Sequence, residues 1–522
     1  MERGRFGPNR RFSAPTQPIV CLFGLPAYLC DMTVHFPFQN TYSALPANFF
    51  ARVAPTPVAA PRLIKLNRPL AAELGLNPAE LETAEGAEIL AGKTVPEGAE
   101  PIAMAYAGHQ FGHFVPQLGD GRAVLLGEVV DKNGVRRDIQ LKGSGPTPFS
   151  RRGDGRAALG PVLREYIVSE AMAALGIPTT RSLAAVVTGE QVYRGIALPG
   201  AVLTRVATSH IRVGTFQYFA ARQDVEAVRR LADHVISRHY PDLAGTERPY
   251  HALLDAVIAR QAKLIADWLL VGFIHGVMNT DNTSVSGETI DYGPCAFMDG
   301  YDPKQVFSSI DEFGRYAFAN QPRIALWNLT RLAECLLPLF GDDKDQAIKE
   351  AEAALDGFAA QFTDAHQAGL RRKLGLFTQV EGDQPLAQAL FDAMAAVKAD
   401  FTLTFRRLSD AAGSGDDAPV RALFEDPTGL DEWLPRWRQR LADEPQTAAE
   451  RAAAMRQVNP AFIPRNHRIE AVITAAVEND DYAPFEELHA VLARPYDDQP
   501  AFSAYAEPPQ PDERVLQTFC GT

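Results

Sequence analysis

The sequence predicts an α+β protein in which a small sheet carries one helix and the rest of the chain is mostly helical. Strand-like runs separated by turn signals fill residues 100–206, one helical stripe interrupts them at 160–175, and long apolar helical segments follow. The chain has 522 residues, 46% of them hydrophobic and 22% charged, which is typical of a folded, soluble globular protein.

Five segments are expected from the changes in pattern: an N-terminal extension, a segment packing on the rest, a sheet lobe, a helical lobe, and a helical extension with the C-terminal tail, at 1–31, 32–99, 100–206, 207–410 and 411–522. Residues 1–31 are expected to be disordered, with Met32 as the ordinary start. Arginines ahead of the apolar run 19–30 leave a targeting segment or a structured arm as alternatives. That run is shorter than the ~20 residues of a membrane helix.

Short strands separated by turns predict the sheet, at 114–118, 123–130, 135–142, 183–187, 191–194 and 201–206. Asn133-Gly134 marks one hairpin, and Thr188-Gly189-Glu190 is interpreted as a second hairpin turn. A helix at 160–175 ends at Gly176. Further helices are predicted at 251–273 and 324–340, and a loop at 411–417.

Charge and cysteine usage exclude several classes of partner. Acidic residues outnumber basic ones by 64 to 51, a net charge of −13. Nucleic acids and anionic membranes need a basic surface, so we expect neither as a partner. The cysteines are too few for a disulfide scaffold and lack metal-ligand spacing, which predicts a reducing compartment, the cytoplasm: they are Cys21, Cys30, Cys295, Cys335 and Cys520.

A glycine turn lies between the first two predicted strands. Gly119 and Gly121 let the backbone approach phosphates, and Arg122 adds a charge. Lys142 ends the third strand, and Glu165 lies in the helix that follows. Singly these are an ordinary turn and ordinary surface charges, but a lysine held by a helical glutamate orients nucleotides in kinase-like folds.

A second cluster follows the helix predicted at 251–273. His275 and Asn282 have the spacing of the kinase catalytic loop His-Arg-Asp-x-x-x-x-Asn, and Asp291-Tyr292-Gly293 takes the place of Asp-Phe-Gly. Valine occupies position 277, where a kinase has its catalytic aspartate. The order of motifs therefore predicts a protein-kinase-like fold, with a small N-lobe sheet, one key helix, a mostly helical C-lobe and a helical C-terminal extension.

Arginines form a third feature, between and after the lysine and the glutamate. Arg151, Arg152 and Arg156 precede the helix, and Arg205 and Arg212 lie on and after the last strand. Arginines in such a place can hold a triphosphate in an orientation that an ordinary kinase does not use. The spacing of His109 and His113 suggests zinc, but neighbouring glycines argue against a helix and no third ligand is evident.

These residues resemble the selenoprotein O (SelO) family of pseudokinases, which are protein adenylyltransferases. The resemblance runs from about Met32 to the C-terminus, is densest from 100 to 330, and is carried by the stretches 106–112, 117–122, 141–145, 151–155, 279–282 and 291–295. It implies a kinase-like fold with a flipped ATP, so that AMP passes to a Ser, Thr or Tyr hydroxyl of a protein.

The same resemblance implies roles for individual residues. Asp281 would be the proton acceptor, Glu165 would pair with Lys142, and Asn282 with Asp291 would hold Mg²⁺ or Mn²⁺. ATP contacts are implied for Gly119, Gly121, Arg122, Lys142, Asp154, Gly155, Arg205, Arg212 and Asp291. The family often ends in a selenocysteine or cysteine motif, whose place Cys520 takes.

Several alternatives stay open. Cys295 and Cys520 are either a redox pair that ties the tail to the metal segment or two unpaired thiols. An ordinary kinase transferring the γ-phosphate and a non-catalytic ATP-binding scaffold are the competing functions. Val277 counts against the kinase, because phosphoryl transfer uses the missing aspartate, but it does not separate a transferase from a scaffold.

Overall fold

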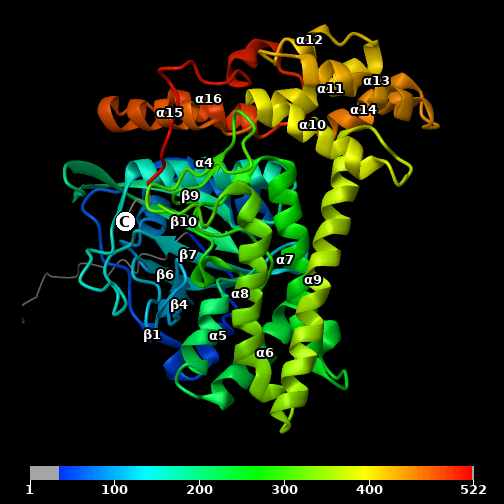
Figure 1. Cartoon of the computed structure of the whole chain (residues 1–522). Helices are drawn as coiled ribbons and strands as arrows, with labels where there is room; N and C mark the ends of the chain where they lie inside the picture. Colours follow the sequence, from blue (N-terminus) through cyan, green and yellow to red (C-terminus); the bar gives the residue numbers. More distant parts are fainter. Residues whose placement is uncertain (1–33, 520–522) are drawn as a thin grey trace, which may run out of the picture.

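The computed structural model describes residues 34–519, and its centre is one eight-stranded antiparallel sheet (Figure 1). The strand order is β1-β3-β6-β7-β10-β9-β2, with β8 paired to β10. The strands are β1 (Phe50–Arg52), β2 (Arg62–Leu66), β3 (Ile102–Met104), β6 (Ala123–Val130), β7 (Arg136–Lys142), β8 (Ala157–Ala158), β9 (Arg181–Tyr193) and β10 (Ala197–Ala207). Thus β1 and β2, both from the segment before residue 100, are the two edge strands of the sheet.

The β6–β7 hairpin is confirmed. Gly134 adopts a φ of 79°, and the Asp131 carboxylate accepts hydrogen bonds from the backbone of Asn133 and Val135. A glycine tolerates this left-handed backbone without strain, so the Asn-Gly signal gave the correct turn. Because Lys142 ends β7 opposite Ala123 and Leu203, the turn fixes where the lysine stands in the sheet.

The second predicted hairpin turn, Thr188-Gly189-Glu190, is wrong. Strand β9 runs through these residues, and the chain reverses only after Tyr193. Val187 pairs with Ala201 and Gln191 pairs with Pro199, so residues 188–190 form a bulge opposite Gly200. Gly189 has a φ of 75°, which serves a bulge as well as a turn, and this is why the local signal was ambiguous.

Helix α4 (Leu159–Ala174) is the predicted key helix of the sheet lobe. It lies between the sheet, which it contacts at β9 and β10, and the helices α15 (Asn466–Asn479) and α16 (Ala483–Leu492) (Figure 1). Burial on both sides explains why its apolar residues extend beyond one stripe. Gly176, at a φ of 78°, follows its end.

Helices cover the remaining part of the chain, and Figure 1 shows the long α9 running beside α7 and α8. The first set is α1 (Arg68–Glu73), α2 (Pro78–Leu81), α3 (Ala84–Leu90), α5 (Val213–Ala220), α6 (Val225–His239), α7 (Pro249–Leu270), α8 (Gln321–Leu336) and α9 (Lys344–Lys373). The predicted helix at 251–273 is α7, which ends earlier because Phe273–Ile274 form β11, paired with β12 (Ala296–Phe297).

The helices that follow α9 share a hydrophobic core with the end of α7 and with the β11–β12 pair, and in it the rings of Trp433 and Trp437 stack with centroids 5.4 Å apart. These helices are α10 (Asp383–Val397), α11 (Phe401–Ser414), α12 (Ala418–Arg421), α13 (Thr428–Ala442) and α14 (Ala448–Arg456). The loop predicted at 411–417 starts too early, because α11 continues to Ser414 and ends at Gly415. The expected boundary at 410/411 therefore falls inside α11. Between residues 34 and 519, no helix is long and apolar enough to cross a membrane.

Candidate functional site

The sheet lobe and the loops at 275–293 meet around a cavity of about 450 Å³, a size ordinary for a small-molecule site. All the residues for which the sequence implied ATP contacts line it: Gly119, Gly121, Arg122, Lys142, Asp154, Gly155, Arg205, Arg212 and Asp291. Asp281 and Asn282 line it as well. Glu165 lies behind Lys142, in a neighbouring cavity of about 210 Å³. The fold therefore brings together residues that are spread over the range 119–291, more than 170 residues of sequence.

Lys142 and Glu165 form the expected ion pair. Nζ of Lys142 lies 2.5 Å from Oε2 of Glu165 and 3.0 Å from Oδ1 of Asp291. Both partners of the first pair are more than nine-tenths buried. Since β7 carries the lysine and α4 the glutamate, packing of α4 on the sheet fixes the direction in which the ammonium group points.

Asp291 is the point on which three cations converge. Its Oδ1 lies 2.8 Å from Arg205 and its Oδ2 3.2 Å from Arg212, in addition to the Lys142 contact. Burial alone would raise the pKa of Asp291, but the charges of Lys142, Arg205 and Arg212 hold it well below its usual value. Its φ of 65° is a left-handed backbone that costs a non-glycine residue energy, as occurs at functional sites.

The glycine turn is shaped by packing within the protein. A Cβ on Gly119 would stand 2.3 Å from the Phe149 ring, and one on Gly121 would stand 2.9 Å from the Phe149 carbonyl oxygen. A Cβ on Gly155 would stand 2.1 Å from the Gly145 carbonyl oxygen. The sequence argument placed these glycines here for a phosphate. The structure adds that the glycine turn and the 145–155 loop can pack this closely only because these three positions carry no side chain.

Asp281 lies in the short 3-10 helix Thr280–Asn282, at the wall of the cavity. Gln110 donates to its Oδ2 at 3.2 Å, and Oδ1 has no hydrogen-bond partner among the described residues. Burial raises the pKa of Asp281 to about 6. A carboxylate at the cavity wall whose pKa is raised toward neutrality is suited to accept a proton from a group that enters the cavity.

Sequence reasoning missed several residues that hold the charged groups in place. Gln140 accepts two hydrogen bonds from Arg205, at 2.7 and 3.1 Å, and the Tyr106 ring lies 4.5 Å beneath the Arg212 guanidinium. Alternation along β7 offered one signal, since Gln140 precedes Lys142 by two and shares its face of the strand. No local signal pointed to the Gln110 contact, because that pairing spans 171 residues.

Comparison with known proteins identifies the family. The model of the family described as protein adenylyltransferase SelO matches residues 32–493. The chain is 99% identical over 491 residues to the protein nucleotidyltransferase YdiU of Bradyrhizobium sp. strain BTAi1, 94% of this chain and 100% of that protein. Identities to the proteins of the same name from Bradyrhizobium diazoefficiens and Rhodopseudomonas palustris strain BisB18 are 77% and 74%, with the same coverage.

The chain belongs to the SelO family. It is thus an adenylyltransferase, an enzyme of the nucleotidyltransferase class that uses ATP to modify proteins. The family resemblance inferred from the sequence motifs is confirmed.

A divalent ion would find two oxygen donors in this SelO-family cavity. Asn282 donates its amide hydrogen to the Val277 carbonyl at 2.9 Å, which fixes the amide, and Asp291 supplies a carboxylate. From residue 34 to 519 there is no group of three or more His, Cys, Asp or Glu side chains placed to hold a metal. Two hard donors fit Mg²⁺ or Mn²⁺ only when phosphate oxygens and water complete the coordination.

Cys295, from the expected redox pair, is buried, and burial raises the pKa of its thiol to about 12. Its partner Cys520 lies outside the described residues, as does the expected extension 1–31. The tail leading to Cys520 is described up to Phe519. Thr518 donates to the carbonyl of Pro294 at 2.5 Å and forms a bridge with Ser308, so the tail passes beside the residue that precedes Cys295.

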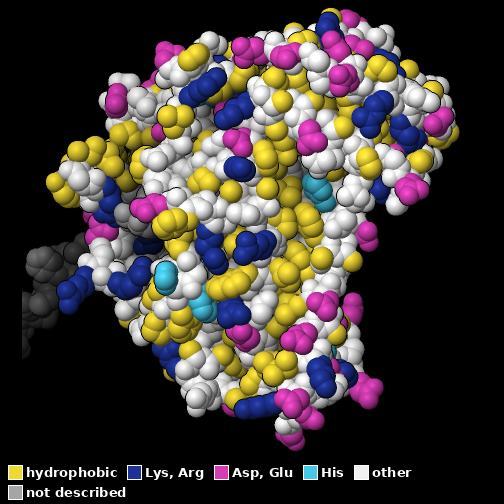
Figure 2. Space-filling model, viewed as in Figure 1, with side chains coloured by type: hydrophobic (Ala, Val, Ile, Leu, Met, Phe, Trp, Pro, Cys, Tyr) yellow, Lys and Arg dark blue, Asp and Glu magenta, His cyan; other side chains and the backbone are white. Residues whose placement is uncertain are grey.

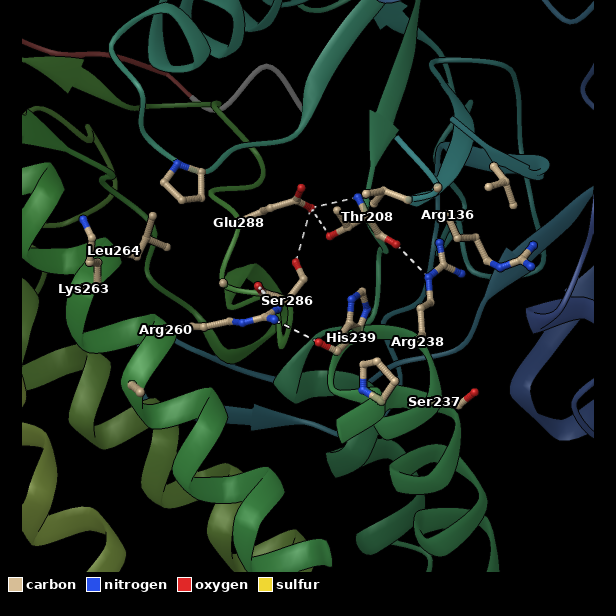
Figure 3. Close-up of a pocket in the computed structure, with 17 residues that line it drawn as sticks. Arg136, Thr208, Ser237, Arg238, His239, Arg260, Lys263, Leu264, Ser286 and Glu288 are labelled. Carbon is tan, nitrogen blue, oxygen red and sulfur yellow. Dashed lines mark hydrogen bonds between the residues drawn. The ribbon is translucent and has the colours of Figure 1, made fainter. Parts of the chain in front are cut away.

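A larger cavity, of about 890 Å³, lies between the β6–β7 hairpin, α6 and α7 (Figure 3). The polar side chains that line it are hydrogen-bonded to other residues of the protein. Glu288 accepts from Thr208 and Ser286, and Arg260 donates to two backbone carbonyls. Arg238 is held by Asp138 and the Thr208 carbonyl. Volume alone therefore does not single out the candidate site. In the smaller cavity the pKa of Asp281 is raised and that of Asp291 is lowered, a contrast typical of sites that carry out chemistry.

Proposed function

We propose that the chain binds ATP in a flipped orientation in a kinase-like cavity and transfers AMP to Ser, Thr or Tyr hydroxyls of proteins. One observation carries the proposal: Arg205 and Arg212 join Lys142 around Asp291, deep in the cavity. An ordinary kinase uses one lysine at this point. Three buried cations suit a β,γ-diphosphate held inside, which leaves the α-phosphate toward Asp281 and the mouth.

The proposed kinase-like fold rests on the same parts. The β7 lysine, the α4 glutamate, the 275–282 loop and Asp291 occur in kinase order; the lysine, the loop and Asp291 meet around one cavity, and the glutamate pairs with the lysine from behind it. We propose the sheet lobe at 100–206, the helical lobe at 207–410 and the extension beyond it as the working divisions, with 32–99 packed on the lobes. The sparse cysteines support a cytoplasmic location.

The transfer step follows from the place of Asp281 at the cavity wall and from its raised pKa. The acceptor hydroxyl gives its proton to the Asp281 carboxylate while its oxygen forms a bond to the α-phosphorus. The bond from the α-phosphorus to the oxygen that bridges to the β-phosphate breaks, and pyrophosphate leaves with that electron pair. Lys142, Arg205 and Arg212 hold the leaving group, and Gln110 fixes the Asp281 carboxylate through its Oδ2. A divalent ion held by Asn282 and Asp291 would neutralise phosphate charge.

The competing kinase reaction is disfavoured by one position. Val277 lines the cavity where a kinase carries its catalytic aspartate, and its side chain cannot accept a proton. Asp281, four residues later, provides the carboxylate instead.

Labelled ATP tests the proposal. Purified chain is incubated with an acceptor protein and with ATP labelled either at the α- or at the γ-phosphate. Protein should acquire label from the α position only, and Asp281→Asn should remove it. Asp255→Asn, which makes the same change at an exposed carboxyl on α7, is the control and should keep wild-type labelling. Label arriving only from the γ position would make the chain a kinase, and label from neither would make it a scaffold.

A further inference from the structure

Large apolar side chains stand exposed around the mouth of the nucleotide cavity. This mouth patch consists of Tyr193, Ile196, Ile310, Phe313, Leu516 and Phe519. Their exposed fractions run from 52% for Ile310 to 95% for Phe313. Large exposed apolar side chains gathered at the mouth of a cavity are typical of a surface that binds another molecule.

The segment 307–313 and the C-terminal tail bring four of these residues together. Ile310 lines the nucleotide cavity itself. Thr518 pairs with Ser308, which places Leu516 and Phe519 beside that segment. Phe519 lines the neighbouring cavity, which shares Lys142 and Arg122 with the first. The patch is therefore continuous with the site.

The tip of the β9–β10 hairpin supplies the other two. Arg194, between Tyr193 and Ile196 in sequence, lines the nucleotide cavity and forms two hydrogen bonds with Asp154, at 2.8 and 2.9 Å. That pair ties the hairpin to the rim of the cavity. Figure 2 shows apolar side chains gathered at the end of the molecule where this hairpin extends in Figure 1.

Two arginines add charge to the same rim. Arg151 and Arg152 are exposed, and neither side chain forms a hydrogen bond or ion pair with another residue of 34–519. Arg151 lines the cavity. Their φ values of 48° and 73° place both in a left-handed backbone, a strain kept where the chain needs the side chains in one direction.

We propose that the mouth patch, with Arg151 and Arg152, docks the acceptor protein through an extended segment carrying apolar and acidic residues beside the modified hydroxyl. The inference rests on the proposed function. Because the hydroxyl must reach Asp281 through this mouth, the flanking residues of the acceptor meet the patch. Apolar residues of the acceptor bind by covering the patch. Carboxylates of the acceptor bind by pairing with the two arginines, although the net charge of this enzyme is negative.

Synthetic peptides test the docking surface. Every peptide has a central Ser, Thr or Tyr as the acceptor. The residues that flank it are Leu and Glu in the first set, Leu and Lys in the second, and Ser and Glu in the third. AMP transfer from α-labelled ATP is measured for the wild type, for Ile310→Ser with Phe313→Ser, and for Arg151→Ala with Arg152→Ala. Matched controls are Ile348→Ser on α9, 42% exposed, and Arg436→Ala on α13, which is exposed and unpaired within 34–519.

The Leu and Glu peptides should be transferred best. The apolar double variant should raise their KM by roughly five- to ten-fold, with KM for ATP unchanged, as expected when exposed apolar contacts are lost. The arginine variant should remove the preference for Glu over Lys. Both controls should behave as the wild type.

Other results would overturn the inference. Equal transfer to all three sets, or double variants with wild-type KM values for peptide, would show that the patch does not dock the acceptor. An arginine variant that raises only the KM for ATP would assign those arginines to the nucleotide. A wild type that labels other proteins but shows no peptide preference leaves the proposed function standing, whereas one that labels nothing from α-labelled ATP overturns both.

Discussion

Gln110 donates a 3.2 Å hydrogen bond to Oδ2 of Asp281 and leaves Oδ1 without a partner among the described residues. The two-stranded β4–β5 hairpin (Gly108–Gln110 and His113–Val115) presents this glutamine. Gly108 completes the wall, because a Cβ there would stand 2.5 Å from Oδ1. Gln110 and Gly108 thereby fix the carboxylate, with Oδ1 buried against Gly108.

Asp281→Asn should stabilise the chain above about pH 6. Burial raises the pKa of Asp281 to about 6, so the folded chain holds this proton more tightly than the unfolded chain, whose value is about 4. The cost of the buried carboxylate is absent below about pH 4 and develops as pH rises through 6. We expect a gain of about 2 kcal/mol at pH 7.5 and none near pH 4, from urea unfolding without divalent ions.

The same residue predicts a pH profile for activity. AMP transfer by the wild type should rise with pH through about 6, where Asp281 loses its proton, and Asp281→Asn should lower it by about 100-fold or more at pH 7.5. A gain in stability of equal size at both pH values, or activity retained by the amide, would contradict the assigned role.

Asp291→Ala should abolish AMP transfer and weaken the fold. Lys142, Arg205 and Arg212 then lose their shared anion, and a buried charge left unpaired costs about 3 kcal/mol. Inorganic pyrophosphate should restore part of the lost thermal stability by replacing the carboxylate. Stability that stays at the wild-type level without any added anion would show that the three cations do not depend on Asp291.

Arg205→Lys and Arg212→Lys should each retain only part of the wild-type activity. Arg205 reaches Gln140, Glu165 and Asp291 at once through the planar fork of its guanidinium, and a lysine has no such fork. We expect a rise of about ten-fold in KM for ATP for either lysine variant and a larger loss for alanine. Wild-type KM and turnover in both alanine variants would leave the flipped nucleotide without support, and Arg436→Lys is the control.

The redox pair remains a prediction that the tail geometry supports. Thr518 contacts Pro294, so one residue of the tail, Phe519, separates this contact from Cys520, while Cys295 follows Pro294 directly. Mass spectrometry of oxidised protein should find the Cys295–Cys520 peptide pair. Reductant should change the AMP-transfer rate of the wild type and leave Cys520→Ser unchanged. Because burial raises the pKa of the Cys295 thiol to about 12, the pair should form slowly. Two free thiols after long oxidation would reject it.

Lys373→Met should stabilise the chain at neutral pH. The ammonium group is buried over the Phe405 ring at 4.3 Å, without an ion-pair partner in the described chain, and burial lowers the pKa of Lys373 to about 7. The unfolded chain therefore binds this proton more tightly than the folded chain. The free-energy cost of burying the charged ammonium group is full below pH 7 and is lost as pH rises toward 10. We expect a gain of about 2 kcal/mol at pH 7 that shrinks by pH 9.5, with activity unchanged. A loss of stability at pH 7 would show that the ammonium–ring contact outweighs burial.

The sequence predicted what depends on neighbouring residues. Asn133-Gly134 fixed the β6–β7 turn, and the spacing from His275 to Asn282 and Asp291 pointed to one constellation, because turn chemistry and motif order are local. The Thr188-Gly189-Glu190 error has the same origin: a glycine with positive φ suits a hairpin turn and a strand bulge alike, and only pairing with β10 decides between them.

Tertiary structure alone decided how the charges share the site. The sequence named Arg205, Arg212, Lys142 and Asp291 separately, and packing of α4 and the 275–293 loops against the sheet joins them around one carboxylate. The carboxylate of Asp281 is held by Gln110, 171 residues away, and the tail reaches Pro294 across 224 residues. Contacts over such separations leave no local pattern, because they follow from how whole elements pack and not from the residues beside them.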